Sequence, residues 1–366
     1  MPFSKTKKIS QWITLVERPI ELEDNTSYQL VTVRRGFAGV ESRGIFKGKE
    51  IKVKNYFLVQ AGDFLISKRQ IAHGACGIVP ESLDGAVVSN EYNVFVPQKE
   101  TNIEFFFLIM QLPYYKRLFY LMSDGVHIEK LLFKTNDWMK RSLSLPPLPE
   151  QQKIATILST QDKVIELKEK LLVQKQQQKK YLMQQLLTGK KRLSGFNEKW
   201  RFAKLENVSK YSASAASFKT YESHLGCGPY PVYDASGCFG NIDFYENEQP
   251  YISIVKDGAG AGRVALCEEK SSTIGTLGCI FANDIDLLYL FYCMSAVDFQ
   301  IYSNGSTIPH VYYKDYKNMV LYLPCELEQK AIVEILSAAD HEIDLLQKSI
   351  EAEKQKKKAL MQLLLT

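Results

Sequence analysis

The stretch that decides the fold is LSLPPLPEQQKIATILSTQDKVIELKEKLLVQKQQQKKYLMQQLLT, residues 143–188, because residues 321–366 repeat it as LYLPCELEQKAIVEILSAADHEIDLLQKSIEAEKQKKKALMQLLLT. The two copies align without a gap at a constant offset of 178 residues, and about half of the aligned positions are identical. Self-similarity at one fixed period indicates a structural repeat. Each copy follows a different globular stretch. The sequence therefore predicts two similar modules, each followed by the same long helix.

Apolar residues recur every seven positions in both copies. This series consists of Leu158, Ile165, Leu172 and Leu186 in the first copy, and of Leu336, Ile343, Ile350 and Leu364 in the second. Lys179 interrupts the first series and Lys357 the second. A seven-residue repeat with polar flanks predicts a coiled-coil seam. Neither helix can bury its stripe alone, so the other copy is the expected partner, in an antiparallel pair.

Two points about this helix remain open from the sequence. A coiled coil used only for dimerisation is the alternative to an internal pair, but it does not explain why the preceding domain is also duplicated. The polar middle, QKQQQKK at Gln174–Lys180 and KQKKK at Lys354–Lys358, suits either a zone close to phosphates or a solvated helix face.

Composition places the chain among soluble proteins of ordinary type. It has 366 residues, enough for two domains with hydrophobic cores, and is 45% hydrophobic and 24% charged. The N-terminal MPFSKTKKIS lacks the apolar region of a signal peptide, and the apolar run Phe105–Met110 is too short to span a bilayer. Seven cysteines without a C-x-x-C pair favour reduced, buried thiols. We therefore expect a cytoplasmic protein with no membrane association.

The net charge of +5 is unevenly distributed along the chain. Residues 1–145 and 146–198 each carry +5, whereas residues 199–322 carry −3 and residues 323–366 carry −2. The first half thus suits a polyanionic partner. In the second half, binding to nucleic acid would depend on where individual cations lie.

The order of short apolar runs predicts two α+β domains of one type. In both globular stretches, strands are followed by a Gly-rich loop, further strands, a helix and a second Gly-containing loop. The expected helices are Ile103–Met122 and Asp286–Tyr302. The chain then divides into a first domain, 1–145, a central helix and linker, 146–198, a second domain, 199–322, and a C-terminal helix, 323–366.

A Gly-rich loop in the second domain, KDGAGAGRV at Lys256–Val264, resembles a phosphate cradle only superficially. It is not G-x-G-x-x-G and is followed by the strand-like VALC, so a nucleotide site is not expected. Two interpretations remain: a tight β-turn, or a loop whose exposed backbone and flanking Lys256 and Arg263 approach phosphates or base edges. The corresponding stretch of the first domain, Ile66–Val79, contains Lys68, Arg69 and His73.

A second pair of loops precedes the repeated helices. Gly305–His310 reads GSTIPH, with Lys314 and Lys317 shortly after it, and the first domain has GVHIEK at Gly125–Lys130. The histidines show no metal-ligand spacing, so no metal site is expected. The candidate contacts to nucleic acid are Lys68, Arg69, His73, Lys256, Arg263, Thr307, His310, Lys314 and Lys317.

Motifs of catalysis are absent from the sequence. It contains no H-E-x-x-H, G-x-S-x-G or Walker A motif, no N-P-P-[YF] tetrapeptide and no dinucleotide fingerprint. Together with the duplicated architecture, this favours a non-catalytic binding subunit with no catalytic residues of its own.

Several long segments resemble a known family. LPPLPEQQKIATILSTQDKVIELKEKLLVQKQQQKKYLMQQLLTGKKRLSGF, residues 145–196, resembles the central region of the specificity subunits of type I restriction–modification enzymes. AGDFLISKRQIAHGACGIVPESLDGAVVSNEYNVF, residues 61–95, resembles a target-recognition domain of that family, as do YPVYDASGCFGNIDFY, residues 230–245, and GSTIPHVYYKDYKNMVLYLP, residues 305–324. The resemblance covers essentially the whole chain.

The resemblance implies a fold and a function. Each domain would read one half of a bipartite sequence in double-stranded DNA, and the two helices would form an antiparallel coiled coil that sets the spacer between the halves. Two modification subunits with S-adenosylmethionine and restriction subunits with ATP and Mg²⁺ would join this chain, which would carry no cofactor itself.

The chain departs from the family pattern in two places. The second copy reads LPCELEQKAI where the first has LPPLPEQQKI, so two prolines are lost at the second junction. The −3 charge of residues 199–322 is unusual for a DNA reader. We therefore expect this domain to have a basic face with Lys256, Arg263, Lys314 and Lys317, opposite an acidic one.

Two alternatives to DNA recognition belong to other classes. A coiled-coil adaptor with two protein-binding domains would bind nearly independently of salt, whereas DNA binding weakens steeply as salt rises. An enzyme with an unrecognised site in the Gly-rich loop would be active as a purified single chain.

Overall fold

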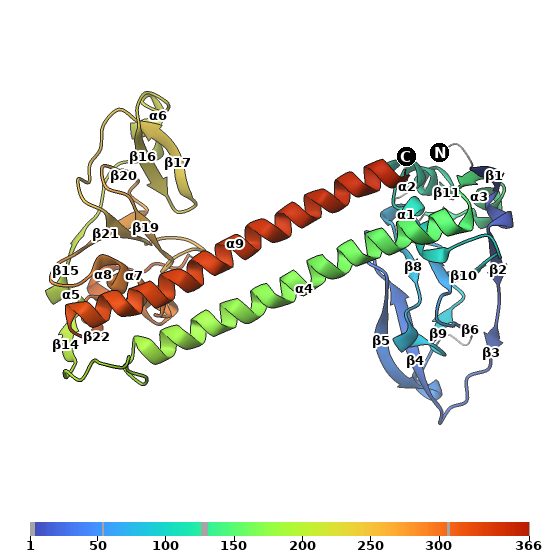
Figure 1. Cartoon of the computed structure of the whole chain (residues 1–366), viewed down its shortest axis with the longest axis horizontal. Coiled ribbons are helices and arrows are strands. Elements are labelled where there is room, and N and C mark those ends of the chain that lie inside the picture. Colours follow the sequence, from blue (N-terminus) through green and yellow to red (C-terminus); the bar gives the residue numbers. More distant parts are fainter. Residues whose placement is uncertain (1–3, 53–54, 126–130, 306–307, 366) are drawn as a thin grey trace. The chain divides into compact units, whose positions relative to one another are not determined.

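The computed structural model describes residues 4–52, 55–125, 131–305 and 308–365. It consists of two compact units, Met1–Glu166 with Glu351–Thr366 and Leu167–Ile350. Each unit contains one β-rich domain together with part of each long helix, α4 (Leu148–Leu186) and α9 (Glu326–Leu365) (Figure 1).

The elements of the first domain, in chain order, are β1 (Lys5–Lys8), η1 (Ile9–Gln11), β2 (Ile13–Val16), β3 (Pro19–Ile20), β4 (Ser27–Val33), β5 (Val40–Lys47), η2 (Gly48–Glu50), β6 (Tyr56–Leu58), β7 (Phe64–Ser67), η3 (Ile71–His73), β8 (Cys76–Ile78), η4 (Glu81–Leu83), β9 (Val87–Ser89), β10 (Tyr92–Pro97), α1 (Ile103–Met110), α2 (Pro113–Leu121), β11 (Ser123–Asp124), β12 (Leu132–Phe133), α3 (Thr135–Met139) and β13 (Ser142–Leu145).

Those of the second domain are β14 (Arg201–Lys204), α5 (Leu205–Val208), β15 (Ser209–Ser212), α6 (Phe218–Glu222), β16 (Tyr230–Asp234), β17 (Gly237–Ile242), β18 (Tyr251–Val255), β19 (Val264–Cys267), β20 (Ser272–Thr273), β21 (Leu277–Ala282), α7 (Leu287–Ser295), η6 (Phe299–Tyr302), α8 (Tyr313–Tyr316) and β22 (Val320–Leu323).

The two domains share one frame. Each has a four-stranded antiparallel sheet with the same strand order, β2-β10-β7-β8 in the first and β15-β21-β18-β19 in the second. Each also has a two-stranded ribbon in which the first strand of the domain pairs with the last, β1 with β13 and β14 with β22. This closure brings the start of each domain to the point where the long helix begins.

Outside this frame the domains differ. The first domain adds a five-stranded sheet, β3-β6-β9-β4-β5, whereas the second adds a three-stranded sheet, β17-β16-β20. Each additional sheet contains one parallel pair, β4 with β9 in the first domain and β16 with β20 in the second. The prediction of two α+β domains of one type is thus confirmed for the frame, while the additional sheets are particular to each domain.

The helix predicted over Ile103–Met122 is in fact two helices. α1 ends at Met110, and α2 begins with Pro113 in its first turn. Proline is favourable at the start of a helix but interrupts its interior, which explains the break. The second domain behaves similarly, because Asp298 accepts a hydrogen bond from Gln300 N and starts the short η6 after α7 has ended.

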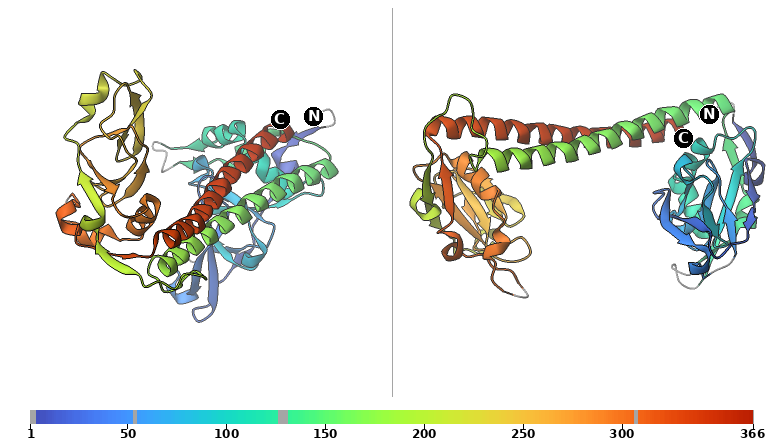
Figure 2. Two further views of the ribbon diagram at one scale, coloured as in Figure 1. Left: turned by 60° about the vertical axis from the view of Figure 1, so that its left-hand side comes forward. Right: turned by 90° about the horizontal axis from the view of Figure 1, so that it is seen from below.

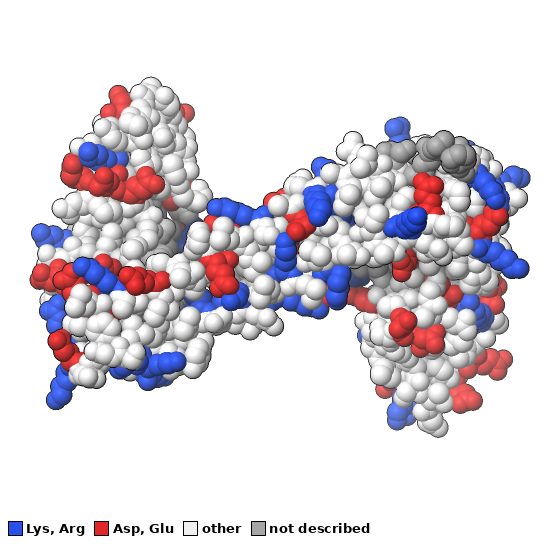
Figure 3. All heavy atoms as spheres, viewed as in Figure 1, with Lys and Arg blue, Asp and Glu red and all other residues white. Residues whose placement is uncertain are grey.

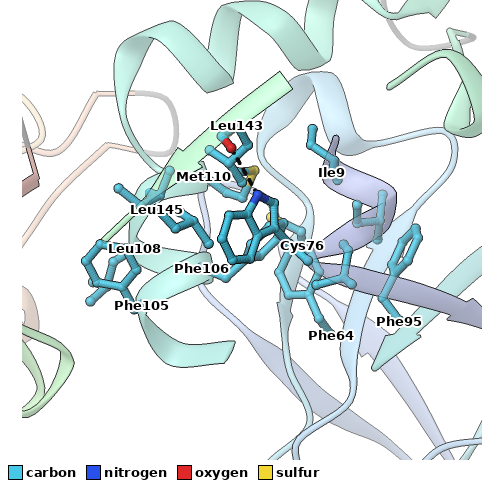
Figure 4. Packing of buried hydrophobic residues seen from close by; sticks show 14 of the residues in the cluster. Ile9, Phe64, Cys76, Phe95, Phe105, Phe106, Leu108, Met110, Leu143 and Leu145 are labelled. Carbon is cyan, nitrogen blue, oxygen red and sulfur yellow. Dashed lines mark hydrogen bonds between the residues drawn. The ribbon is translucent and has the colours of Figure 1, made fainter. Parts of the chain in front are cut away.

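Each domain core includes residues of the long helices. In the first domain, Trp12 and Phe106 are buried in an aromatic cluster, and the Trp12 indole donates to Leu143 O at 2.9 Å (Figure 4). Leu158 of α4 and Leu365 of α9 belong to the same cluster. Burial of such side chains contributes roughly 1.5–3 kcal/mol each. The helix ends are therefore fixed to the domain by its own core.

The second core follows the same plan. It contains buried residues of β18, β21 and α7, together with Leu186 at the end of α4, the adjacent Leu187, and Leu336 from α9. α4 ends just before Gly189, which has a φ of +68°. A Cβ atom at Gly189 would lie 3.2 Å from the Trp200 ring, so both the turn and the packing favour glycine.

The long helices lie alongside each other in all views (Figures 1 and 2). Their contacts join residues of α4 to residues of α9 in reverse order along the chain, from Gln161–Glu353 to Lys179–Asp340, so the pair is antiparallel, as predicted. Lys and Arg side chains are interspersed with Asp and Glu over the pair (Figure 3). No helix within the described residues is long and apolar enough to cross a bilayer.

The expectation that the thiols are buried is met by some cysteines only. Cys76, Cys267, Cys279 and Cys293 are buried, but Cys227 and Cys238 are exposed, so the expectation is wrong for that pair. Cys238 lies next to the hairpin turn on β17, the edge strand of its sheet, and Cys227 lies in the loop before β16.

Candidate nucleic-acid interface

Two loops of the second domain that the sequence singled out are hydrogen-bonded to each other. Asp257 and His310 form a backbone bridge. Gly258 N donates to Pro309 O at 3.0 Å, and Val311 N donates to Lys256 O at 2.8 Å. The Gly-rich loop and the Pro309–Val311 segment therefore form one surface, although they lie about fifty residues apart in sequence.

Side chains complete this loop surface. His310 Nδ1 lies 2.7 Å from Asp257 Oδ1, and the imidazole is parallel to the Tyr312 ring at a centroid distance of 5.8 Å. Lys314 Nζ lies 5.8 Å from the centroid of the same Tyr312 ring. The arrangement presents a cation, an aromatic face and an imidazole close together, groups that can contact phosphates, sugars or base edges.

The Gly-rich loop is the tight turn between β18 and β19. Val255 N donates to Arg263 O at 2.9 Å, and Gly262 N donates to Val255 O at 2.8 Å. Gly262 has a φ of +87°, and a Cβ atom there would lie 2.4 Å from Cβ of Phe299. The Arg263 guanidinium donates to Ala235 O. The turn interpretation therefore holds, and contact of this turn with nucleic acid stays a prediction.

The corresponding stretch of the first domain, Ile66–Val79, is the equivalent hairpin, between β7 and β8. Lys68 Nζ donates to Asn90 O at 2.6 Å, and Arg69 pairs with Glu91 at 2.7 Å. These contacts hold both cations over the turn between β9 and β10. His73 closes η3 in the same loop.

The remaining candidates are distributed differently. Thr307 lies outside the described residues, as does the GVHIEK loop of the first domain beyond Gly125. Lys317 Nζ pairs with Glu206 at 3.0 Å, at the start of the domain. Lys256 and Lys314 thus belong to the loop surface around His310, Arg263 lies across the Gly-rich turn, and Lys317 is bound to α5. A common basic face for all four stays a prediction.

A joint that the sequence analysis missed connects each domain to its helix. Gln151, fully buried in the first turn of α4, donates to Pro146 O at 2.8 Å and to Glu100 O at 3.0 Å. Its Oε1 atom accepts from Asn102 N at 2.9 Å, and Asn102 is the N-cap of α1. One amide thus binds the domain helix to the long helix.

The same joint recurs in the second domain. Gln329 stands at the position that the 178-residue offset assigns to Gln151, and it is 4% exposed. It donates to Pro324 O at 3.0 Å and accepts from the N–H of Asp286, the N-cap of α7, at 3.0 Å. Despite the two lost prolines, the bond to the proline carbonyl and the bond from the N-cap of the domain helix are therefore present at both junctions.

The apolar series of the long helices are covered to different degrees. Leu158, Ile165, Leu186, Leu336 and Ile350 are buried, and Leu172, Ile343 and Leu364 are half-buried. The outermost members pack into the domain cores, since Leu158 and Leu364 contact the first core and Leu186 and Leu336 the second. Polar contacts between the helices are interspersed with the series.

Comparison with known proteins agrees with this geometry. The family model "Type I restriction modification DNA specificity domain" matches residues 14–176 and again residues 197–354. The chain belongs to this family. Each match takes in most of one β-rich domain and most of the long helix that follows it.

Individual relatives have the same description. The chain is 28% identical over 249 residues to the putative type I restriction enzyme MjaX specificity subunit of Methanocaldococcus jannaschii. That alignment covers 61% of this chain and 58% of the relative, so the chain matches little more than half of the relative's length.

Two solved structures have the same fold. The S subunit of a type I restriction–modification system from M. genitalium superposes with a TM-score of 0.65 at 14% identity, covering 99% of this chain and 96% of that one. A chain from a study of complex assembly and conformational transition of the type I system superposes with a TM-score of 0.59 at 17% identity, covering 100% and 97%.

The buried thiols of this specificity-family chain are not activated nucleophiles. Burial raises the pKa of Cys279 to about 11 and that of Cys293 to about 12, so both remain protonated at neutral pH. Within the described residues, no group of three or more His, Cys, Asp or Glu side chains could hold a metal ion.

The ribbons at the start of the two specificity domains differ in their outward-facing side chains. Thr6 and Ser144 are paired across the first ribbon, with their hydroxyl oxygens 2.6 Å apart. The equivalent pair in the second ribbon is Phe202 and Tyr322, whose rings are 5.2 Å apart and which are 66% and 41% exposed. The shared frame therefore carries a polar surface in one domain and an aromatic one in the other.

Proposed function

We propose that this chain is the non-catalytic DNA-specificity subunit of a type I restriction–modification complex, in which each domain reads one half of a bipartite target. The observation that supports this most directly is the repeated frame with different additional sheets. Two different sequences can then be read by two domains that are attached to the helices in the same way.

Recognition would use the hairpin loops of each domain. The cations of the loops contact phosphates and fix the position of the domain, while hydrogen bonds to base edges in the major groove provide specificity. The proposed contacts are Lys68, Arg69, His73, Lys256, Arg263, Thr307, His310, Lys314 and Lys317. Their support is the hydrogen-bonded loop surface around His310 and the equivalent position of the first-domain hairpin.

The helices would set the spacer between the two half-sites. The repeated glutamine joint supports this proposal, because it attaches each domain to the first turn of its helix through a buried side chain. The seam would be formed by the eight Leu and Ile residues of the two apolar series. A coiled-coil adaptor with two protein-binding domains remains the alternative.

The proposed partners follow from the family. Two modification subunits would supply the adenine methyltransferase chemistry with S-adenosylmethionine, and restriction subunits would supply ATP- and Mg²⁺-dependent translocation and cleavage. The complex would act on cytoplasmic DNA. The proposed divisions of the chain are 1–145 and 199–322 for recognition, and 146–198 and 323–366 for the helices.

A domain exchange tests the modular proposal. Replacing residues 199–322 by the equivalent segment of a relative, in a complex with the modification subunits, should change one half of the methylated sequence. The other half and the spacer should stay unchanged. If both halves change together, the two domains do not read independently.

The adaptor alternative is separated by salt dependence. Binding of DNA by this chain in its complex should weaken linearly in log–log form as salt rises, with a slope set by the number of phosphate contacts. Absence of DNA binding at low salt, together with salt-independent capture of a protein, would favour the adaptor.

A further inference from the structure

Two ion pairs between the long helices are related by the sequence repeat. Lys179 of α4 pairs with Asp340 of α9, and Lys357 of α9 pairs with Asp162 of α4 at 2.5 Å. The 178-residue offset converts Lys179 into Lys357 and Asp162 into Asp340. The same contact therefore forms once in each unit, with the roles of the two helices exchanged.

Both lysines stand at positions of the apolar seven-residue series. Their side chains are 23% and 25% exposed, so they are largely covered although each sits where Leu or Ile would continue the stripe. A polar residue at such a position lowers the stability of a coiled coil but specifies its register. Stability alone would therefore favour Leu at both sites.

Other polar contacts hold the helices in the same register. The pairs, each joined at 2.7 or 2.8 Å, are Gln161 with Glu353, Lys168 with Ser349, and Lys175 with Glu342. In every pair the residue number rises along α4 as it falls along α9. One antiparallel alignment thus satisfies them all.

A slip by one heptad would affect apolar and polar contacts differently. The apolar series repeats every seven residues, so Leu and Ile would again meet Leu and Ile. Asp340, in contrast, would lie opposite Leu172 or Leu186, depending on the direction of the slip. Asp162 would lie opposite Ile350 or Leu364. In the native register, the ammonium group offsets the free-energy cost of removing the carboxylate from water. Opposite an apolar side chain, that cost is no longer offset.

In the second unit, the ion pair is also bound to the recognition domain. The Tyr292 hydroxyl of α7 donates to Asp340 Oδ2 at 2.8 Å, and Lys179 Nζ lies 5.6 Å from the centroid of the Tyr292 ring. Asp340 therefore accepts from the partner helix and from the domain at once.

We propose that Lys179–Asp340 and Lys357–Asp162 determine the register of the helix pair, and through it the spacer length that the target must have. The part concerning the spacer rests on the proposed function, whereas the part concerning register does not. The pairs would act as specificity elements of the spacer without contacting DNA.

Cross-linking in the full chain tests the register directly. The background carries Cys227→Ser, Cys238→Ser and Cys325→Ser, since the other four cysteines are buried. Gln161→Cys with Glu353→Cys reports the observed register. Gln161→Cys with Leu360→Cys, or with Leu346→Cys, reports a slip of one heptad in either direction.

The test variant combines Lys179→Leu, Lys357→Leu, Asp162→Ala and Asp340→Ala. We expect a slipped cross-link to appear and the native cross-link to weaken, although a slip also withdraws apolar helix ends such as Leu186 and Leu365 from the domain cores. The exchanged variant, Lys179→Asp, Asp340→Lys, Lys357→Asp and Asp162→Lys, should restore native cross-linking alone. Native cross-linking alone in the test variant would overturn the inference, since the apolar helix ends at Leu186 and Leu365 would then suffice.

A matched control removes the same charges from pairs within single helices. Lys163 with Glu166 and Asp344 with Lys348 are such pairs. Alanine at all four positions should leave only the native cross-link. A slipped cross-link in this control would show that loss of charge alone, and not loss of the two interhelical pairs, causes the slip, and would also overturn the inference.

A second readout separates this inference from the proposed function. Seven helical residues span about 10.5 Å, which corresponds to roughly three base pairs of DNA at 3.4 Å each. In the complex with its modification subunits, the slipped variant should therefore methylate targets whose spacer differs by about three base pairs. A slipped cross-link with an unchanged spacer would show that the helices do not set the spacer. It would leave intact the inference that the two ion pairs determine the register.

Discussion

Arg192 forms a bidentate ion pair with Glu328, and both nitrogen–oxygen distances are 2.8 Å. Glu328 lies in the first turn of α9 with a side chain only 1% exposed, and it also accepts from Trp200 Nε1 at 2.9 Å. The guanidinium carbon lies 5.3 Å from the centroid of the Trp200 ring. The linker that follows α4 is therefore bound to the start of α9. Glu150 is the residue that the 178-residue offset aligns with Glu328, and its side chain is exposed.

Arg192→Met should lower the unfolding midpoint of the chain. It removes the cation from a buried carboxylate, whose desolvation is then compensated by one indole hydrogen bond only. Thermal unfolding should show a larger decrease than for Lys330→Ala, which breaks an exposed pair with Glu326. Adding Glu328→Gln to Arg192→Met should recover part of the loss, and no recovery would argue against an electrostatic origin.

The glutamine joints should contribute similarly in the two domains. Gln151→Ala and Gln329→Ala each leave buried backbone groups without their partner, so we expect each to reduce the free energy of unfolding by about 1–3 kcal/mol. Gln152→Ala, at an exposed neighbouring position, is the control and should change little. Denaturant unfolding measures these effects. A loss at one joint only would show that the two junctions are not energetically equivalent.

Gly262→Ala should impair the second recognition domain alone. The Cβ atom would lie 2.4 Å from Cβ of Phe299 in a backbone conformation that favours glycine, so the turn carrying Lys256 and Arg263 must shift. Gly258→Ala is the matched control, because its φ of +92° is similar but no atom lies within 4 Å of a Cβ there. We expect loss of selectivity at one half-site for Gly262→Ala, and a smaller effect for Gly258→Ala, measured by methylation of target variants.

Cations of the loop surface should contribute to the salt dependence of DNA binding. Lys256→Ala and Lys314→Ala should each weaken binding across sequences and reduce the salt slope by about one. Lys317→Ala should have a smaller effect, because that lysine is paired with Glu206. Titrations at several salt concentrations give the slopes. Equal slopes for all three variants and the unchanged chain would place the loop surface away from DNA.

The sequence was sufficient for the frame of the fold where a local pattern decides it. The long helices follow from the repeat and its apolar series, and the structure has them as α4 and α9. The ribbons β1–β13 and β14–β22 could not be predicted in this way, because each pairs residues more than a hundred positions apart. No pattern within these strands identifies the strand with which each one pairs.

The candidate site was predictable to a similar extent. The loops around Lys256 and His310 were singled out by glycine and cations, but their mutual hydrogen bonds depend on tertiary structure. The roles of Gln151 and Lys179 were missed for different reasons. A buried glutamine looks like any polar residue of a helix, and Lys179 appeared as an interruption until its partner Asp340 was known. The offset of 178 residues was the available signal, since both are identical in the two copies.

The polar and aromatic ribbons make the two domains chemically distinguishable, although they share one frame. A subunit that docked on both through one and the same surface would meet the hydroxyls of Thr6 and Ser144 on one domain and the rings of Phe202 and Tyr322 on the other. Equal affinity for the two domains would then require other contacts to offset the difference between the polar and the aromatic ribbon.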